Sequence, residues 1–402
     1  MGADLLCKTS NGDLPFHSIF GRYSDPDRAF FLPEIPNAHP VDFAKMQHNP
    51  VGIRDYLLFH IACSMGNVKW TKYFLDHGVD PNLRATVFCH DFYAETPLHT
   101  ALRNRGGSKL EIVKLLPESG ANPTAQDDYL LTPLHYMINN GEPEIVDLLM
   151  SYGADVNSQD VSLQTPLHTM LENDLDLLDR ELKKLIVPLL NYGADINLVN
   201  EKGSSPLSSI KVCNEFELFA SSIETLMIHS VKLRWIGLLV NEDNKKAFCN
   251  LFDKCSNDFQ SKLPKLKKQC AKEVKNLQNI RISDNNVTID RILMQDFNRL
   301  PMANANDEFH ALVNSNKFQK QFPIYGPMLK MLVKRGQVRR ELLEKSLKVF
   351  NCFVKNSFPR ECSELILQSL SNGDLINLII SKNEIKKSVP ETSSDSSVSE
   401  QK

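Results

Sequence analysis

The tetrapeptide Thr-Pro-Leu-His occurs three times in this chain of 402 residues, at Thr96–His99, Thr132–His135 and Thr165–His168. Two weaker copies flank it, at Leu57–His60 and Ser205–Ser208. The fourth positions of the five copies fall at residues 60, 99, 135, 168 and 208. Recurrence of one short pattern at this period indicates a stacked array of similar units rather than a single globular core.

A second pattern runs in phase with the first. Gly-Ala-Asp-x-Asn or a variant of it stands at Gly78–Asn82, Gly120–Asn122, Gly153–Asn157 and Gly193–Asn197. Thr is a favourable helix cap and Pro suits the first helical position, so each tetrapeptide predicts the start of a short helix. Apolar residues at three- and four-residue spacing predict a second helix before each Gly pattern. Each unit is therefore predicted to be two helices and a turn.

Together the two patterns resemble the ankyrin repeat, a turn with two antiparallel helices in about 33 residues. The resemblance implies an all-α ankyrin solenoid in which residues 51–215 hold about four to five repeats. Pro15–His17 is a weak copy of the tetrapeptide, so the N-terminal segment 1–50 is expected to contain a degenerate repeat. In ankyrin repeats the His of each unit is structural and bonds to the backbone of a turn, so no catalytic, metal-binding or cofactor-binding role is expected. This applies to His60, His99, His135 and His168.

Composition is that of a globular protein, with 42% hydrophobic and 24% charged residues. Nine cysteines without a Cys-x-x-Cys pair are typical of a reducing compartment. The first residues lack a basic segment followed by an apolar run, and no apolar run reaches the length of a membrane span. We therefore expect an intracellular protein, in the cytoplasm or the nucleus, without a membrane partner. The absence of phosphate-loop, nucleophile-elbow, zinc-protease and kinase motifs predicts that it is not an enzyme.

Charge divides the chain into two parts. Residues 1–225 carry 17 Lys and Arg against 30 Asp and Glu, whereas residues 226–402 carry 29 against 19. Opposite signs suggest that the two parts face different partners. Six lysines lie within the basic stretch 262–275, which has two interpretations: a nuclear signal or nucleic-acid patch, or a solvated helix face. The solvated face is favoured because no aromatic interleaving or nucleic-acid motif accompanies the lysines, so no nucleic-acid partner is expected.

The C-terminal half is predicted to be helical. Residues 216–280 form a connecting region, and Arg339–Val354 forms an amphipathic helix with its apolar residues on one face. A helical hairpin follows, in which Pro359 opens the first helix and Asn372-Gly373 ends it. Asp374 is predicted to cap the second helix.

This hairpin resembles an F-box, although Phe358 stands where Leu is usual and the segment is shorter than a full F-box. Phe322–Gly326 and Arg339–Leu343 precede it, and this order after an ankyrin array resembles the PRANC domain of poxvirus and parasitoid-insect ankyrin proteins. The predicted domain covers residues 281–385. The resemblance implies a host-interaction role and binding to the Skp-type linker of a cullin ubiquitin ligase. The residues implied in that contact are Pro359, Glu361, Ile366, Leu367, Leu370, Leu375 and Leu378.

The alternative for this hairpin is a terminal helix pair buried against residues 226–354, since apolar helix pairs usually belong to a core. Cys352 and Cys362 lie in helical patterns without a nearby His and are expected to be buried. The Ser-rich tail 386–402 contains nothing that could build a core and is expected to be disordered.

The array itself is predicted to bind a target protein through the tips between successive units. Aromatic residues beside carboxylates suit a target with basic and apolar features. The leading hypothesis is an adaptor that brings this target to the ligase, and the alternative is an inhibitor that sequesters a signalling factor, such as one of the Rel/NF-κB class, without ubiquitination. The predicted tip residues are Arg84, Phe88, Asp91, Tyr93, Asp127, Asp128, Tyr129, Gln159, Asp160 and Leu163.

Overall fold

The structure is a computed structural model, and its fold is all-α apart from one short strand pair. The N-terminal segment 1–50 and most of the Ser-rich tail, both subjects of predictions, lie outside the described residues. So do Phe88, Asp91, Tyr93 and Phe358. The described residues are 53–84, 94–103, 109–137, 142–172, 179–210, 220–238, 240–282, 287–294, 307–353 and 359–388.

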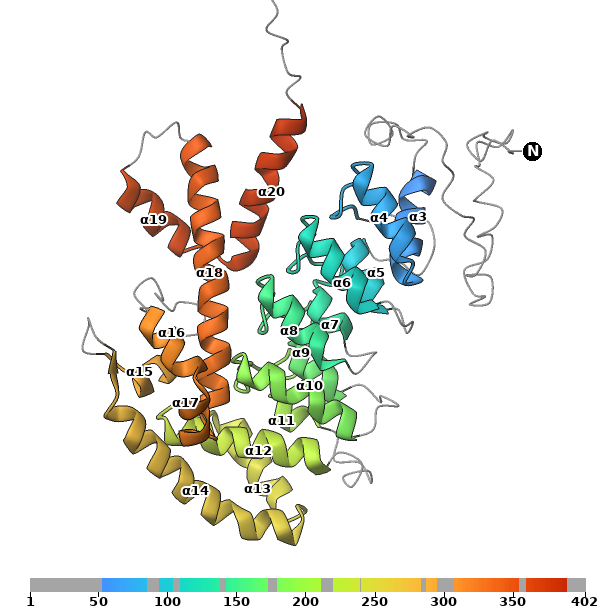
Figure 1. The fold of residues 1–402 in the computed structure, drawn as a ribbon. Helices are drawn as coiled ribbons and strands as arrows, with labels where there is room; N and C mark the ends of the chain where they lie inside the picture. The colour runs from blue at the N-terminus through green and yellow to red at the C-terminus, as the bar shows by residue number, and fades with distance from the viewer. Residues whose placement is uncertain are drawn as a thin grey trace, which may run out of the picture.

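Helix pairs stack in two rows that form an elongated array (Figure 1). Each helix of a row packs on the corresponding helix of the next pair. The first row holds α3 (Ile53–Ser64), α5 (Pro97–Arg103), α7 (Pro133–Tyr136), α9 (Pro166–Glu172), α11 (Pro206–Ser209) and α13 (Glu242–Phe252). The second row holds α4 (Val68–Asp76), α6 (Lys109–Glu118), α8 (Pro143–Ser151), α10 (Asp179–Asn191), α12 (Ala220–Trp235) and α14 (Asn257–Gln278).

Residues of the Thr-Pro-Leu-His pattern form hydrogen bonds within each unit and between neighbouring units. The side chain of Thr132, the residue before α7, lies 2.9 Å from His135 Nδ1, which also accepts the Thr132 backbone N–H. The other ring nitrogen, His135 Nε2, lies 3.2 Å from the carbonyl oxygen of Gln164 in the next unit. His99 and His168 make the same contacts, at 3.1 Å to the following unit. The expected structural role of these histidines is confirmed.

The stack continues beyond residue 215, where the array was predicted to end. That boundary falls inside the fifth helix pair, between α11 and α12. Gly237 adopts a φ of +84° and ends α12 as Gly193, with a φ of +87°, ends α10. The predicted connecting region therefore supplies a helix of the fifth pair and, with α13 and α14, a sixth pair in the same register. Periodicity missed this pair because it lacks both sequence patterns.

The chain then turns back on the array. It passes a two-residue antiparallel pair, β1 and β2, and short helices before the 28-residue helix α18, followed by α19 and α20. These elements are β1 (Arg281–Ile282), β2 (Val287–Thr288), α15 (Ile289–Met294), α16 (Asp307–Asn314), α17 (Asn316–Gln321), α18 (Gly326–Phe353), α19 (Arg360–Gln368) and α20 (Asn372–Ser388). α20 extends three residues into the predicted disordered tail, which began at residue 386.

The Phe322–Gly326 segment anchors the start of α18 to the sixth and fifth pairs. Phe322 and Tyr325 are fully buried, and the Tyr325 hydroxyl donates to the carbonyl oxygen of Lys232 at 3.0 Å. The buried carboxylate of Glu273 on α14 accepts the backbone N–H groups of Ile324 and Tyr325 at 3.2 Å. Burial raises the pKa of Glu273, although these amides and Lys232 oppose the shift. The segment is thus part of the continuous core that runs from Phe59 to Val333.

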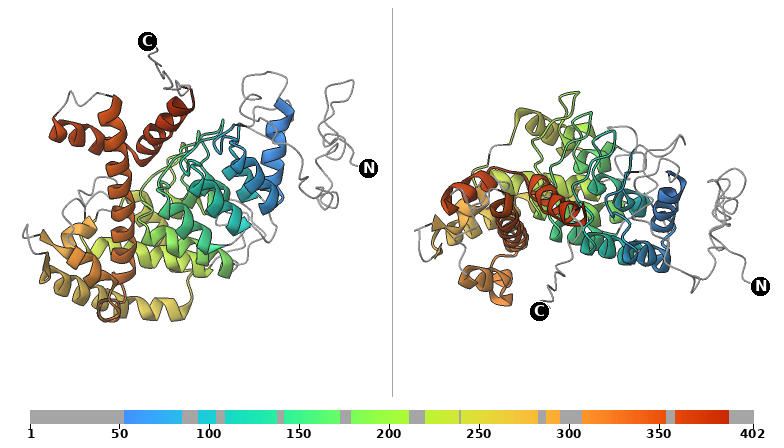
Figure 2. Two further views of the ribbon diagram at one scale, coloured as in Figure 1. Left: turned by 45° about the horizontal axis from the view of Figure 1, so that its top comes forward. Right: turned by 90° about the horizontal axis from the view of Figure 1, so that it is seen from above.

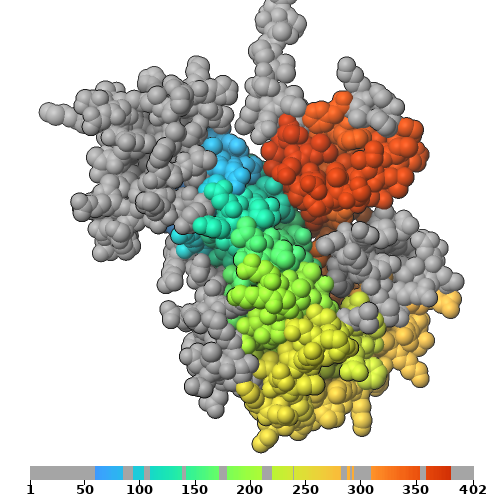
Figure 3. Space-filling model, turned by 180° about the vertical axis from the view of Figure 1, so that it is seen from behind, coloured from blue at the N-terminus to red at the C-terminus, as the bar shows by residue number. Residues whose placement is uncertain are grey.

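From this anchor α18 rises beside the array, and α20 packs between α18 and the upper repeats (Figure 2). Seen from behind, the C-terminal helices lie against the part of the stack that holds the early repeats (Figure 3). The array and the C-terminal helices therefore pack together as one body.

Candidate protein-interaction surfaces

Loops between successive units, here called finger loops, are built on a repeated side-chain turn. Asp127 Oδ1 accepts the backbone N–H groups of Tyr129 and Leu131 at 2.8 and 2.9 Å. Asp160 makes the same two bonds one unit later, and Asn200 makes them in the following loop. A short polar side chain that bonds backbone two and four residues ahead closes the tip of each loop.

Adjacent finger loops are also joined by backbone hydrogen bonds. The Val161 N–H donates to Tyr129 O at 3.0 Å, and the Glu201 N–H donates to Ser162 O at 2.9 Å. The three tips consequently form a continuous edge. Apolar side chains along this edge are 38 to 53% exposed, and we call them the finger strip: Tyr129, Leu130, Val161, Leu163 and Val199.

Two leucines of the strip hold a backbone conformation that suits glycine. Leu130 has a φ of +59° and Leu163 a φ of +58°, and Gly203 occupies the same place in the next loop with a φ of +72°. A left-handed conformation is costly for a residue with a Cβ, so such positions deserve a functional explanation. The array places large apolar side chains in solvent at two of the positions where glycine would relax the backbone.

The predicted tip residues divide by what they contact. Asp128 and Leu163 are exposed, and Tyr129 belongs to the strip. Arg84 is half-exposed, donates to the carbonyl oxygen of Gln126 at 2.8 Å and lies 3.7 Å from Asp128.

Two of the predicted carboxylates, Asp127 and Asp160, accept backbone hydrogen bonds within their own loops. Asp127 is buried at 2% exposure, and its other oxygen accepts the Tyr136 hydroxyl at 2.7 Å. Asp160 uses Oδ1 in its own turn, and the Gln159 amide donates to Leu163 O at 2.8 Å. Leu130, Val161 and Val199 were missed, although each lies within three residues of a turn-forming Asp or Asn, a signal that could have identified them.

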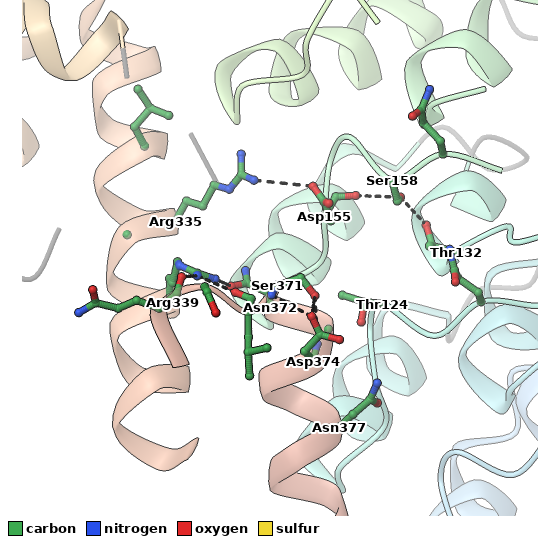
Figure 4. A pocket seen from close by; sticks show the side chains of 18 residues that line it. Thr124, Thr132, Asp155, Ser158, Arg335, Arg339, Ser371, Asn372, Asp374 and Asn377 are labelled. Atoms are coloured by element: carbon green, nitrogen blue, oxygen red, sulfur yellow. Dashed lines mark hydrogen bonds and ion pairs between the residues drawn. The ribbon is translucent and has the colours of Figure 1, made fainter. Parts of the chain in front are cut away.

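A cleft of about 770 Å³ separates the finger-loop side of the array from the C-terminal helices (Figure 4). Buried Arg335 on α18 crosses to the array, where it donates to Tyr192 O at 3.0 Å and lies 3.7 Å from Asp155. Asn122 donates to Asn377 Oδ1 on α20 at 2.9 Å. These bonds join residues that are far apart in the sequence and tie α18 and α20 to the repeats.

Arg339 holds the loop between α19 and α20. Its guanidinium donates to Asn372 Oδ1 at 2.7 Å and to the carbonyl oxygens of Gln368 and Leu370 at 3.0 and 2.7 Å (Figure 4). Burial lowers the pKa of Arg339. Nearby, a Cβ at Gly373 would lie 2.8 Å from the Thr124 hydroxyl oxygen, so any other residue at this position would force the Thr124 side chain to move.

The hairpin of α19 and α20 has an inner and an outer face. Leu367 and Leu375 are buried, at 1% and 0% exposure, and Ser346 on α18 donates its hydroxyl to Leu375 O at 3.2 Å. Leu365 and Ile366 point outward, with exposures of 67% and 42%. α19 lies on the side of α18 away from the array (Figures 1 and 2).

The predicted linker-binding residues therefore do not share one surface. Pro359, Glu361 and Ile366 are exposed, Leu370 and Leu378 are half-buried, and Leu367 and Leu375 face inward. Sequence reasoning missed Leu365, the most exposed of the large apolar side chains described. When four of six consecutive helical residues are apolar, apolar side chains lie on both faces of the helix. The periodicity of the sequence therefore could not show that Leu365 is exposed.

Three details of the C-terminal prediction are corrected. Ser371, not Asp374, caps α20: the Ser371 hydroxyl accepts the Asp374 N–H at 3.1 Å, and the Asp374 carboxylate accepts the Ser371 N–H at 3.0 Å. Cys352 and Cys362 are exposed rather than buried, because each lies on the outer face of its helix.

No group of three or more His, Cys, Asp and Glu side chains within the described ranges is placed to hold a metal ion. None of the described helices is long and apolar enough to cross a membrane.

Comparison with known proteins supports the assignment of ankyrin repeats. A family model of ankyrin repeats in three copies matches residues 39–127 and 107–200, so this part of the chain consists of ankyrin repeats. The fowlpox virus ankyrin repeat protein FPV232 is 25% identical over 214 residues, 48% of this chain and 40% of its own length. A second fowlpox virus ankyrin repeat protein, FPV024, is 23% identical over 333 residues, 81% of this chain and 45% of its own length.

A yeast protein is also similar. The probable 26S proteasome regulatory subunit p28 of Saccharomyces cerevisiae is 29% identical over 137 residues, 34% of this chain and 54% of its own length. The chain thus spans about half the length, or less, of these relatives. Ankyrin repeats indicate a role in protein–protein interaction.

Proposed function

We propose that this protein is an adaptor that binds a target protein through the finger strip and a Skp-type linker of a cullin ubiquitin ligase through α19. The observation that carries the proposal is the presence of two exposed apolar surfaces on separate elements of one body. One is the finger strip, and the other is formed by Leu365 and Ile366. Exposed apolar groups gathered in this way mark interaction sites.

The finger strip suits a target with apolar side chains and basic groups at their edge. Tyr129 offers a rigid aromatic contact, and the Asp128 carboxylate beside it is exposed. Strained Leu130 and Leu163 support a binding role, because both side chains are exposed rather than packed in the core of the array. A prearranged edge also reduces the entropy lost on binding.

The C-terminal helices support the second half of the proposal by their rigidity. Arg335 and Asn377 hold α18 and α20 on the repeats, and Arg339 ties the loop between α19 and α20 to α18. We therefore expect α19 to stay at a constant distance from a bound target. A constant distance suits an adaptor that must present its target to an enzyme held by another subunit. The name of the yeast relative refers to the proteasome, which agrees with a role in protein degradation.

The decisive experiment is a pull-down of a purified Skp-type linker protein by the full chain. Replacing both Leu365 and Ile366 with Asp should abolish capture, because it places two charges in the apolar contact. The matched control is Leu312→Asp, which alters an exposed leucine on α16, and it should leave capture unchanged. Full capture by the Leu365→Asp, Ile366→Asp variant would overturn the linker assignment. Leu367 is unsuitable for this test, since its substitution would disturb the core.

The second candidate is an inhibitor that sequesters its target, for example a signalling factor of the Rel/NF-κB class. Packing of Leu367 and Leu375 against α18 favours it, because this places part of the F-box-like apolar set in the core. The two functions differ in the fate of the target. Loss of the target that a proteasome inhibitor prevents supports the adaptor, whereas an unchanged level of a stably bound target supports the inhibitor.

A further inference from the structure

A groove of about 830 Å³ lies at the end of the array opposite α19, between the end of α12, the middle of α13 and the middle of α14. Its aliphatic lining comes from Val231, Leu238 and Val240. Two aromatic side chains, Trp235 and Phe248, complete the apolar part. Phe248 is held in place by stacking on Phe252, with ring centroids 6.0 Å apart and an angle of 11° between the planes.

Trp235 is the unusual member of this set. It is 43% exposed, although an indole carries one of the largest apolar surfaces of any side chain. The reason is local: α12 ends at Trp235, and Gly237 turns the chain away in a left-handed conformation before another helix can cover the ring. Exposed tryptophans at the edge of a groove are characteristic of binding hot spots.

The charged side chains of the groove all have the same sign. Arg234, Lys245 and Lys267 line it, and no Asp or Glu does. Lys245 pairs with Glu242 at 2.6 Å on the rim, whereas Arg234 and Lys267 form no ion pair with another of the described residues. Two cations are therefore available to a ligand beside an apolar floor.

The remaining lysines of α14 extend this positive field. Those between residues 262 and 275 are all exposed, which agrees with the solvated face favoured by the sequence. Lys267 lies on a different side of α14 from Lys265 and Lys272. Successive residues of a helix are rotated by about 100° around its axis, which places Lys265 and Lys272 roughly opposite Lys267. Only Lys267 of the six lines the groove.

From these features we propose that the groove is a third protein-binding site, and that it takes a short acidic peptide segment with apolar side chains. Carboxylates of the segment would pair with Arg234 and Lys267 while its apolar side chains cover Trp235 and the aliphatic floor. Electrostatic complementarity would favour acidic over basic partners. Trp235 and Phe248 could stack on a base as well as on an apolar side chain, but the aliphatic floor of Val231, Leu238 and Val240 offers no further ring and suits the apolar side chains of a peptide.

The site is independent of the finger strip and of α19. It lies at the basic end of a chain whose first 225 residues are acidic, so a partner bound here differs in charge from one suited to the finger loops. The protein would then hold three partners at once, and loss of one contact would leave the others intact.

The two tryptophans of the chain make the test direct. Trp70 is buried at 8% exposure, so a change in emission on ligand addition reports on Trp235. The probe is a short synthetic peptide that alternates Asp with Leu and Phe, added to the full chain. We expect a saturable blue shift of the emission, and no shift with the peptide that carries Lys in place of Asp. Anisotropy of the dye-labelled acidic peptide provides a second measurement that does not depend on tryptophan.

Charge reversal tests the geometry. Arg234→Glu with Lys267→Glu should weaken peptide binding by about tenfold or more, because it replaces two attractive contacts by repulsive ones. Lys265→Glu with Lys272→Glu makes the same change in net charge outside the groove and should weaken binding by less than about threefold. Equal loss in both variants would overturn the site, as would the absence of any saturable response. Tighter binding of an oligothymidylate than of the acidic peptide would also overturn it, in favour of a nucleic-acid site.

Discussion

Replacement of Leu163 by glycine and by alanine should reverse the usual order of stability of these two residues. Leu163 has a φ of +58°, in the left-handed region. Both substitutions remove the same apolar side chain and expose the same finger loop. They differ in the Cβ atom, which alanine keeps and glycine lacks.

The expected difference follows from the backbone alone. A left-handed conformation costs a residue with a Cβ roughly 1–2 kcal/mol, and glycine avoids this cost. Glycine has about 0.5–1 kcal/mol of additional conformational entropy in the unfolded chain, which opposes the gain. The Leu163→Gly variant should therefore be more stable than Leu163→Ala by roughly 0.5–1 kcal/mol. At Val161, an exposed neighbour without a positive φ, glycine should be the less stable of the two by a similar amount.

Urea denaturation followed by circular dichroism measures all four variants under one set of conditions. If Leu163→Gly is less stable than Leu163→Ala, the backbone at this tip is not strained and the functional interpretation of Leu163 loses its basis. Target binding should fall in both variants, because each removes the exposed side chain. A more stable protein that binds less well is the expected sign of a residue retained for binding.

Three further predictions concern the repeats and the C-terminal helices. Burial lowers the pKa of His99 to about 3 and of His135 to about 4; because histidines of the unfolded chain titrate near 6.5, the unfolded state takes up protons first, and urea unfolding should show stability falling as the pH drops below about 6.5. A His135→Asn variant should show a weaker pH dependence, and an unchanged slope would contradict the assignment. Arg335→Met should destabilise the contact of α18 with α10 by about 2 kcal/mol, since the Tyr192 carbonyl loses its donor; hydrogen exchange at the end of α10 should accelerate about thirtyfold, and protection equal to that of the unchanged chain would refute the tether. Leu375→Ala should cost about 3 kcal/mol by leaving a cavity, which thermal unfolding would detect, and a shift below one degree would show that this face of α20 is not packed.

The position of the finger loops could be predicted from the sequence, but which of their side chains are exposed could be predicted only in part. The finger loops were identified by the spacing of the two patterns, and Tyr129 and Leu163 were placed on the exposed edge. The same spacing predicts that Asp127 lies on this surface, because it falls between one Gly pattern and the next Thr-Pro-Leu-His. In the structure its oxygens are used by Tyr136 and two backbone amides, an internal role that residue type alone does not reveal.

The repeats could be predicted from the sequence because their interactions join neighbouring units. Each His of the tetrapeptide reaches a carbonyl oxygen 29 to 36 residues away, so one period of the sequence contains the contact and the next period repeats it. The packing of α18 and α20 against the array depends on tertiary contacts and could not be predicted from the sequence. Arg335 meets Tyr192 across 143 residues and Asn122 meets Asn377 across 255, and no periodic signal spans such separations. These long-range contacts bury Leu367 and Leu375 and leave Leu365 and Ile366 in solvent, a choice that the sequence of an amphipathic helix leaves open until its neighbour is in place.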